Sequence, residues 1–438
     1  MFERISAPRL IVMGFAGFVV LGTVLLKLPF SSVGLSWLDA FFIAVSAVCV
    51  TGLTPVDIPS TLSTFGEIVL AGLVQVGGLG IMTAATLGAL LVRDRLGFRH
   101  LLTVREELGS PDAPRNVLRL IGQVALVTVA VELAGALFLT ARFALDGVGL
   151  MNAVGYGLFH AVTAFCNAGF SNLAEGLYPY AGDWTLTLVL AVLVLAGGLG
   201  FPVLVNLYNY PRRRYLTLHS KLVLVPSAIL LVVGVASFAA FEWTNPASMG
   251  GEPLGTKLAQ SVFQGVTPRT AGFQTVDYAD LTDPTLAVQT VLMFIGTAPV
   301  STGGGIKVTT IALIFLILVA QIRGERELTA FGRRVPGNLV GEALALLSLG
   351  ASIIFVATLA LMVSDRLPLL PALFEVTSAF GTVGLSLNVT PELSAFGKVL
   401  IAAVMFMGRV GTITLIVALA ARSKPRRYTY PQEDIAIG

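Results

Sequence analysis

Apolar residues dominate eight long segments of the chain, and most charged residues lie between these segments. A helix needs about 20 residues to cross the roughly 30 Å hydrocarbon core of a bilayer. The pattern therefore predicts an all-α membrane protein with eight transmembrane helices. Their approximate bounds are 10–28, 63–92, 117–140, 184–208, 220–241, 286–320, 341–363 and 396–421. The first segment shows no obvious cleavage site after it, so it is interpreted as a retained span and not a signal peptide.

Most of the 28 Lys and Arg residues fall on one side of these eight segments. Because basic residues gather in cytoplasmic loops, both termini are predicted to be cytoplasmic, as an even number of spans requires. The residues assigned to that side are Arg4, Arg9, those from Arg93 to Arg119, Arg212, Arg213, Arg214, Lys221, Arg323, Arg326, Arg333, Arg334, Arg422, Lys424, Arg426 and Arg427. Those assigned to the other side are Lys27, Arg142, Lys257, Arg269, Arg366 and Lys398.

Each connection on the sparsely charged side contains a second apolar run that is too short to span. A run of this length suits a re-entrant helix, which enters the membrane and returns. The runs are Trp37–Val48, Ala153–Phe165, Leu254–Val266 and Leu369–Phe380. Each is followed by a glycine-containing tetrad, and the tetrads are VTGL at 50–53, NAGF at 167–170, TAGF at 270–273 and TVGL at 382–385.

The chain therefore reads as four repeats of helix, pore loop and helix, in a pseudo-fourfold arrangement. The repeats cover 1–95, 116–212, 218–323 and 336–438, the last including a cytoplasmic tail. The inner spans correspond as well, because each contains a glycine cluster. These clusters are GGLG at 77–80, GGLG at 197–200, TGGGIK at 302–307 and GRVG at 408–411.

The third residue of every tetrad is glycine. Four such loops around one axis can offer backbone carbonyls to a cation that has lost its water. Glycine tolerates the positive φ that such a loop needs, and the C-terminal ends of the short helices would add negative potential. A single glycine in a membrane protein more often serves close helix packing. Four aligned glycines, at Gly52, Gly169, Gly272 and Gly384, favour ion contact.

The chain resembles the Trk/Ktr/HKT superfamily of potassium transporters, and within it the bacterial KtrB subunits. The resemblance rests on these tetrads, on STGGGIKVTT at 301–310, on MGRVGTIT at 407–414 and on the closing YPQEDIAIG. The resemblance covers essentially the whole chain. It implies uptake of potassium, with sodium as a second candidate ion, and no organic cofactor in this chain. Gly52 resembles the potassium-selective version of the filter, since some plant members carry serine there. The tetrads depart from the TVGYG signature of potassium channels, which implies a less restrictive filter.

The resemblance also implies a homodimer in the bacterial inner (plasma) membrane, with one pore per subunit and contacts through the C-terminal tail. A cytoplasmic ring of KtrA-like nucleotide-binding regulatory subunits is the expected partner, and no nucleic acid is expected. The chain has no P-loop and no dinucleotide fingerprint, so ATP dependence would have to come from that partner.

By the same resemblance, the ion sites are backbone oxygens of the tetrads. The residues assigned to them are Val50, Thr51, Gly52, Leu53, Asn167, Ala168, Gly169, Phe170, Thr270, Ala271, Gly272, Phe273, Thr382, Val383, Gly384 and Leu385.

The sixth span contains Pro299 and three consecutive glycines, which cannot hold a regular helix. A broken helix at mid-depth often marks a transport path, and a kinked helix is the structural alternative. The resemblance implies a gating loop around 299–307. Arg409 lies mid-span, where a charge costs at least about 2.5–3.5 kcal/mol. It is expected to line the pore and contact this loop, or to cap the loop for structure alone. The residues assigned to the gate are Gly303, Gly304, Gly305, Lys307 and Arg409.

Weaker candidates occupy corresponding positions in different repeats. His160 and Glu375 lie nine residues before their tetrad glycines and are expected to be buried, hydrogen-bonded structural groups, with proton coupling as the alternative. Cys49 and Cys166 are expected to be small packing residues. Asp57 and Asp277, beyond their tetrads, are interpreted as either cation-concentrating groups or ordinary turn residues.

Composition excludes several classes of protein. With 55% hydrophobic and 12% charged residues, the chain is far from a soluble average. Two cysteines and three scattered histidines form neither a disulfide framework nor a zinc site. The sequence contains no grouping of nucleophile and base that would indicate an enzyme. The alternative function is a sodium- or proton-coupled symporter, which would predict inverted repeats, whereas these repeats run parallel.

Overall fold

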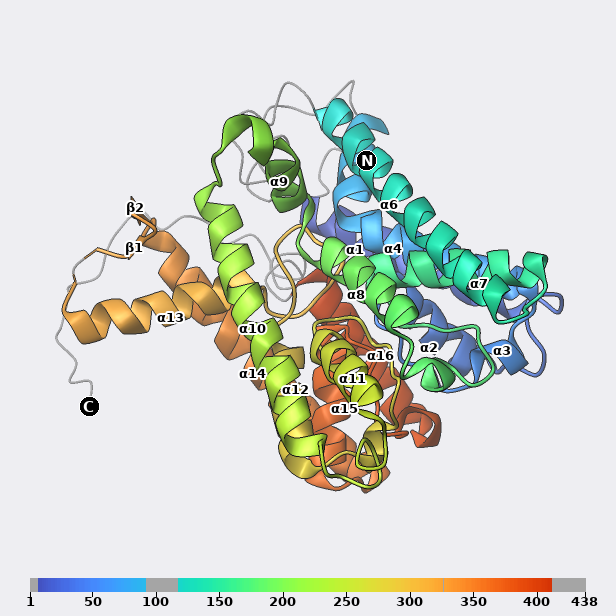
Figure 1. The fold of residues 1–438 in the computed structure, drawn as a ribbon. Helices are drawn as coiled ribbons and strands as arrows, with labels where there is room; N and C mark the ends of the chain where they lie inside the picture. Colours follow the sequence, from blue (N-terminus) through green and yellow to red (C-terminus); the bar gives the residue numbers. More distant parts are fainter. Residues whose placement is uncertain (1–6, 92–116, 326, 412–438) are drawn as a thin grey trace.

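The computed structural model describes residues 7–91, 117–325 and 327–411, which form a helical bundle (Figure 1). Its sheet is a two-stranded hairpin of β1 (Thr329–Ala330) and β2 (Arg333–Arg334). Several predicted features lie outside the described residues. These are the basic residues at position 4, at 93–115, at 326 and after 421, the end of the eighth span, the C-terminal tail and the motif YPQEDIAIG.

The first two predicted repeats have the same order of elements. The first contains α1 (Ala7–Lys27), α2 (Trp37–Val48), α3 (Ile58–Thr61) and α4 (Thr64–Leu91). The second contains α6 (Val117–Leu145), α7 (Leu150–Phe165), the 3₁₀ helix η3 (Tyr178–Tyr180), α8 (Trp184–Gly198) and α9 (Phe201–Arg213).

The last two repeats follow that order too. The third contains α10 (Leu218–Glu242), α11 (Leu254–Val266), η4 (Tyr278–Asp280), α12 (Asp283–Phe294) and α13 (Val308–Arg323). The fourth contains α14 (Asn338–Asp365), α15 (Leu369–Gly381), η5 (Thr390–Glu392) and α16 (Ala395–Val410). The helices predicted over the four short apolar runs are confirmed as α2, α7, α11 and α15.

Local sequence explains where many of these helices begin. Ser36, Asp183, Thr217 and Ser394 are N-caps whose side chains accept hydrogen bonds from backbone N–H groups of the first turn. A proline precedes α11 and α15 and holds the backbone extended there. These helices therefore begin at the same kinds of capping residue as helices of soluble proteins, although most of their side chains are apolar.

Three described helices are long and apolar enough to cross a membrane: Gly122–Leu145, Leu218–Glu242 and Leu339–Asp365. The predicted span at 184–208 covers two helices, α8 and α9, which together are long and apolar enough for one span but meet at a bend of 104°. Gly200 causes the bend with a φ of 81°, and its backbone fits closely against the carbonyl of Pro299. The predicted break in the sixth span is confirmed, because an irregular segment separates α12 from α13.

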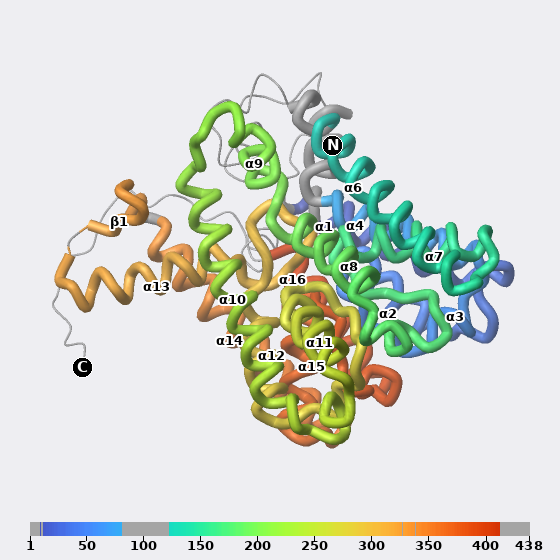
Figure 2. Tube along the Cα trace, viewed as in Figure 1, coloured from blue at the N-terminus to red at the C-terminus, as the bar shows by residue number. Residues whose placement is uncertain are grey.

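The helices of the four repeats pack in a closed cycle. The first helix of each repeat packs against its own short helix, as α1 does against α2 (Figure 2). The inner helix of each repeat then contacts the short helix of the next. These contacts are α4 with α7, α8 with α11, α12 with α15, and α16 with α2. The fourth repeat therefore closes onto the first, and the ion pair between Lys398 Nζ and Asp39 Oδ1, at 2.7 Å, joins them.

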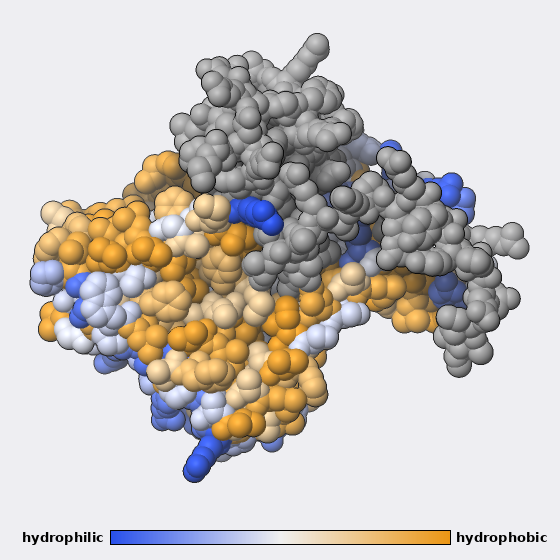
Figure 3. Space-filling model, turned by 180° about the vertical axis from the view of Figure 1, so that it is seen from behind, coloured by the Kyte–Doolittle hydropathy of each residue, from blue (hydrophilic) through white to orange (hydrophobic). Residues whose placement is uncertain are grey.

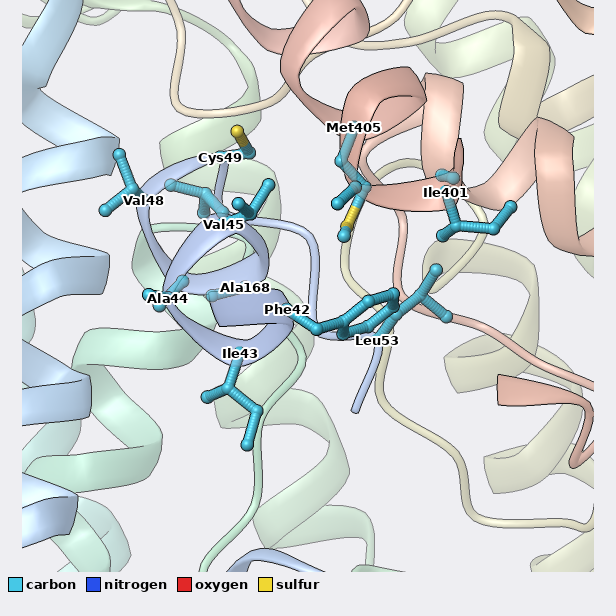
Figure 4. Packing of buried hydrophobic residues seen from close by; sticks show 14 of the residues in the cluster. Phe42, Ile43, Ala44, Val45, Val48, Cys49, Leu53, Ala168, Ile401 and Met405 are labelled. Carbon is cyan, nitrogen blue, oxygen red and sulfur yellow. The ribbon is translucent and has the colours of Figure 1, made fainter. Parts of the chain in front are cut away.

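The largest hydrophobic core lies at this junction. Figure 4 shows Phe42 and Leu53 of the first repeat beside Ile401 and Met405 of α16, and all four side chains are buried. The outside of the bundle is apolar too. In Figure 3 hydrophobic residues cover much of the part of the face that is drawn in colour, with fewer polar residues among them and at its edges. Exposed apolar surface on this scale fits a protein whose sides face lipid.

Candidate functional site

The four tetrads meet edge to edge in a closed ring. At each junction a tetrad glycine lies so close to its neighbour that an added Cβ would collide with a backbone carbonyl oxygen. The glycine and the residue carrying that oxygen are Gly52 with Ala168, Gly169 with Ala271, Gly272 with Val383, and Gly384 with Thr51. Each repeat thus touches the next, the fourth touches the first, and the second residue of each tetrad places its carbonyl oxygen at the junction.

The tetrad backbones alternate in handedness. The third residue has positive φ in every tetrad, from 66° at Gly169 to 100° at Gly52. The first residue also has positive φ, although it is never glycine. These residues are Val50 (56°), Asn167 (62°), Thr270 (64°) and Thr382 (50°). Left-handed backbone at a β-branched residue is strained by about 1–3 kcal/mol and tends to occur at functional sites. Alternation of this kind turns successive carbonyls toward one side of the chain.

The N–H groups of the tetrads bond back to the short helices. The N–H of the second residue donates to a carbonyl near the end of its own helix at 2.7–2.9 Å in all four repeats. In addition, the N–H of Gly52 donates to Ser46 Oγ at 3.0 Å, and that of Gly384 donates to Ser378 Oγ at 3.2 Å. Because these donors face the helices, the carbonyls of the first three residues of each tetrad remain available on the opposite side, whereas the carbonyl of Phe273 accepts from the Thr267 hydroxyl at 2.7 Å.

The side chains of the tetrads anchor the ring. Those of Leu53, Phe170, Phe273 and Leu385, in the fourth position, are at most 1% exposed. The glycines, by contrast, line a cavity of about 710 Å³ that residues from all four repeats surround. The tetrads therefore present backbone to this outer cavity and side chains to the core.

Glycines of the inner helices let the short helices end close to the ring. An added Cβ would collide with a carbonyl oxygen from the last turn of a short helix at three of them. The pairs are Gly77 with Val48, Gly197 with Phe165, and Gly408 with Phe380. The glycine clusters of the inner spans thus serve close packing, and they bring the negative ends of α2, α7 and α15 toward the centre.

The irregular segment 295–307 lies against the first residues of the tetrads. The N–H of Gly304 donates to Thr382 Oγ1 at 2.9 Å. The Thr302 hydroxyl lies 3.0 Å from the side-chain amide of Asn167, which is also 3.1 Å from Thr270 Oγ1. The segment therefore contacts the second, third and fourth tetrads, and it lies on their side away from the outer cavity.

Two cationic side chains hold this segment in place. Arg409, on α16, is 5% exposed and donates to the carbonyls of Thr302 and Gly77. The contact that the sequence predicted between Arg409 and the loop is therefore present. Lys307 donates to the carbonyl of Gly303 at 2.7 Å. Both cations line a second cavity of about 320 Å³, together with Gly303 and Gly305. Ring and loop lie between the two cavities.

His160 and Glu375 have equivalent partners, as their equivalent positions suggested. His160 Nε2 lies 3.0 Å from Ser171 Oγ, and Ser386 Oγ donates to Glu375 Oε2 at 2.7 Å. Thr390 also donates to Glu375. Both side chains are fully buried. The prediction of buried, hydrogen-bonded groups is confirmed. Each of the two side chains lies on a short helix and binds the chain segment that follows its own tetrad.

The remaining predicted residues have structural contacts. Cys49 and Cys166 are buried free thiols. Asp57 caps α3, accepting from the N–H of Ser60, and lines the outer cavity. Asp277 caps η4 and accepts from Asn388 at 3.1 Å. Burial, with a smaller contribution from the carboxylates of Asp277 and Asp280, raises the pKa of the Tyr178 phenol.

Sequence reasoning missed three residues behind the ring. Ser46 and Ser378 each lie six residues before a tetrad glycine, and aligning the repeats would have paired them. Arg269, which the charge count placed on the sparsely charged side, is 5% exposed and donates to the carbonyls of Ser227 and Gly296. Its neighbours in the sequence do not indicate this buried position, because both partners are distant in the chain.

Comparison with known proteins identifies the chain's relatives. The family model of TrkH, described as a cation transport protein, matches residues 10–426. The Ktr system potassium uptake protein B of Bacillus subtilis is 37% identical over 99% of this chain and 97% of its own length. The potassium/sodium uptake protein NtpJ of Enterococcus hirae is 34% identical over 100% of this chain and 98% of its own.

A solved structure has the same fold. The potassium transporter TrkH from Vibrio parahaemolyticus superposes with a TM-score of 0.75 at 20% identity, covering 96% of this chain and 86% of that one. With the family model matched over nearly all of its length and two relatives above 30% identity, this chain belongs to the TrkH family of cation transport proteins.

Proposed function

We propose that this chain is a potassium uptake protein that conducts potassium passively across the bacterial plasma membrane. The ions would pass through the ring of tetrads, and backbone oxygens of residues 50–53, 167–170, 270–273 and 382–385 would replace their water. The names of the relatives support potassium as the ion, and NtpJ's name adds sodium as a second one.

One observation carries this proposal: the tetrads close a ring in which every glycine faces the neighbouring carbonyl. Helix packing alone would explain glycines that face side chains or helix backbone. It would not explain four equivalent positions with left-handed backbone meeting at one centre. A ring of carbonyls with its N–H groups directed outward is the arrangement that a dehydrated cation requires.

In this proposal α1, α4, α6, α8, α10, α12 with α13, α14 and α16 are the membrane-crossing elements, and both termini are cytoplasmic. The helices α2, α7, α11 and α15 are re-entrant. Charge placement supports this orientation, since Arg212, Arg213 and Arg214 end the second repeat on the proposed cytoplasmic side.

The loop around 299–307 is proposed to gate the pore. It contacts three tetrads and separates the two cavities. Arg409 would hold it closed from α16 and would also repel a cation at this depth. Movement of Gly303–Gly305 away from Thr270 and Thr382 would join the cavities.

The word "system" in the relatives' names supports the proposal that the chain works with a partner. We propose a homodimer regulated by a cytoplasmic ring of nucleotide-binding subunits. A sodium- or proton-coupled symporter is the alternative function. The fully buried Glu375 favours it, but both carboxylate oxygens of Glu375 already accept hydroxyl hydrogen bonds.

Flux through liposomes tests the main proposal. Purified protein should pass potassium and rubidium down their gradients faster than sodium, with no need of a sodium or proton gradient. A potassium flux that appears only when a proton or sodium gradient is imposed would favour the symporter. No potassium flux in either condition, from folded wild-type protein and also from the gate deletion described next, would refute both.

Deleting Gly303–Gly305 tests the gate. The deletion removes the part of the loop against Thr270 and Thr382, so basal potassium flux should rise severalfold. Arg409→Gln should act in the same direction, because one charged contact to Thr302 is lost. Unchanged or lower flux in both variants, with normal yield and thermal stability, would contradict a gating role.

A further inference from the structure

Cationic and aromatic side chains gather where α9 turns into α10 beside the β1–β2 hairpin. We call this surface the basic corner. Its residues are Arg212, Arg213, Arg214, Tyr215, Lys221, Phe331, Arg333 and Arg334. All but Lys221 are exposed. The corner is far along the chain from the tetrads, and the conduction pathway does not use it.

Reciprocal contacts join the hairpin to the turn. The Arg333 guanidinium lies 5.6 Å from the ring centre of Tyr215, and Lys221 Nζ lies 5.6 Å from that of Phe331. The hairpin and the α9–α10 turn thus each contribute one aromatic ring and one cation, and both pairs lie at the distance of cation–π contacts. Tyr215 is also fixed from α9, because Asn206 Nδ2 donates to its carbonyl at 3.3 Å.

The positive charge of the corner is largely uncompensated. Within the described part of the chain, the salt bridges formed here are those of Arg334 with Glu327 and of Arg323 with Glu325. Among the described residues, no carboxylate pairs with the guanidinium groups of Arg212, Arg213, Arg214 and Arg333, and guanidinium geometry matches phosphate.

An apolar helix face adjoins the corner. Phe315, Leu318 and Ile322 on α13 are 64%, 55% and 77% exposed, and their spacing places them on one side of the helix. The strand β1 packs against α13, and Figure 1 shows α13 and the hairpin extending away from the bundle. Cations beside an apolar helix face match a ligand that joins an anionic headgroup to acyl chains.

From these contacts we infer that the basic corner binds the phosphate headgroup of an anionic phospholipid, whose acyl chains lie along α13. The bend of 104° between α8 and α9 supports this site, since it turns α9 out of the direction of the span that precedes it. Basic pockets between helices at the cytoplasmic side bind such headgroups in membrane proteins. The inference rests on the cytoplasmic orientation proposed above.

Native mass spectrometry of the full-length, detergent-purified protein tests this site. Phosphatidylglycerol should be retained in preference to phosphatidylcholine of the same chain length. Arg213→Gln with Arg333→Gln should weaken phosphatidylglycerol binding about 30-fold, given the usual contribution of each basic residue near an anionic lipid surface. Arg366→Gln is the matched control for each single variant, Arg213→Gln or Arg333→Gln, because Arg366 is exposed at the far end of α14 and its replacement removes the same single charge. It should leave binding unchanged.

Three outcomes would overturn the inference. One is equal retention of both lipids by the wild-type protein. Another is full displacement of phosphatidylglycerol by inorganic phosphate at millimolar concentration, which would show a free-anion site. The third is normal lipid binding by the double variant together with loss of its response to a soluble regulatory subunit. Lipid retention is measured without ion flux, so its failure is distinct from failure of the proposed transport function.

Discussion

The substitution Gly52→Ser probes the ring directly. Gly52 has a φ of 100°, so a residue with a Cβ is strained by about 1–3 kcal/mol there. The new Cβ would also collide with the carbonyl oxygen of Ala168. That oxygen belongs to backbone and cannot rotate away as a flexible side chain would, so the second tetrad must shift. The substitution therefore moves one of the oxygens that the proposal assigns to the ion.

The expected effect is a loss of discrimination between potassium and sodium. If the displaced oxygen weakens the potassium site by about 1–2 kcal/mol more than the sodium site, the flux ratio falls by about 5- to 30-fold. The assay compares initial potassium and sodium fluxes into liposomes under equal gradients, using wild-type and variant proteins of matched yield.

Gly147→Ser separates this effect from backbone strain alone. Gly147 has a φ of 82°, and nothing lies within 4 Å of the added Cβ. This control should lose some thermal stability but keep the wild-type flux ratio. A Gly52→Ser protein whose potassium-to-sodium ratio stays within about twofold of wild type would refute the assignment of the tetrads as the filter.

Two further predictions concern the supports of the ring. Gly408→Ala should lower the midpoint of thermal unfolding by several degrees, because the new Cβ collides with the carbonyl of Phe380 and overpacking costs about 1–3 kcal/mol. The control Gly72→Ala has open space around the new Cβ and should be neutral or stabilising. Equal midpoints in the two variants would contradict the packing role of Gly408. Glu375→Leu should destabilise the protein by about 1–3 kcal/mol per unpaired hydroxyl, since Ser386 and Thr390 lose their acceptor. Chemical denaturation measures the free energy of unfolding. A variant as stable as the wild type would contradict the role of Glu375 in holding the chain beyond its tetrad against α15.

The repeat was readable from the sequence because its signals are local and recur. An apolar run, a glycine tetrad and an inner glycine cluster return four times, and the structure places helices on the four short runs. Glycine at the third tetrad position was readable for the same reason, since few other residues adopt positive φ freely.

The remaining features depend on contacts that no single segment encodes. Val50 and Thr270 are left-handed although their side chains resist it, and only the surrounding ring enforces that conformation. The bend between α8 and α9 depends on Gly200 meeting Pro299 from another repeat. Arg269 lies next to a tetrad in sequence, yet its buried site is made by α10 and the loop 295–307. Hydropathy and charge counting cannot predict such contacts, because the contacting residues are distant in the sequence.

The contact between α16 and α2 has a consequence for how the protein is made. The ion pair between Lys398 and Asp39 and the packing of Met405 near Phe42 join the last repeat to the first. Until the final repeat has left the ribosome and inserted, the first short helix has no neighbour on that side. A chain that stops early therefore holds three of the four repeats with one flank of the ring uncovered, and the ring closes only when the fourth repeat has been synthesised.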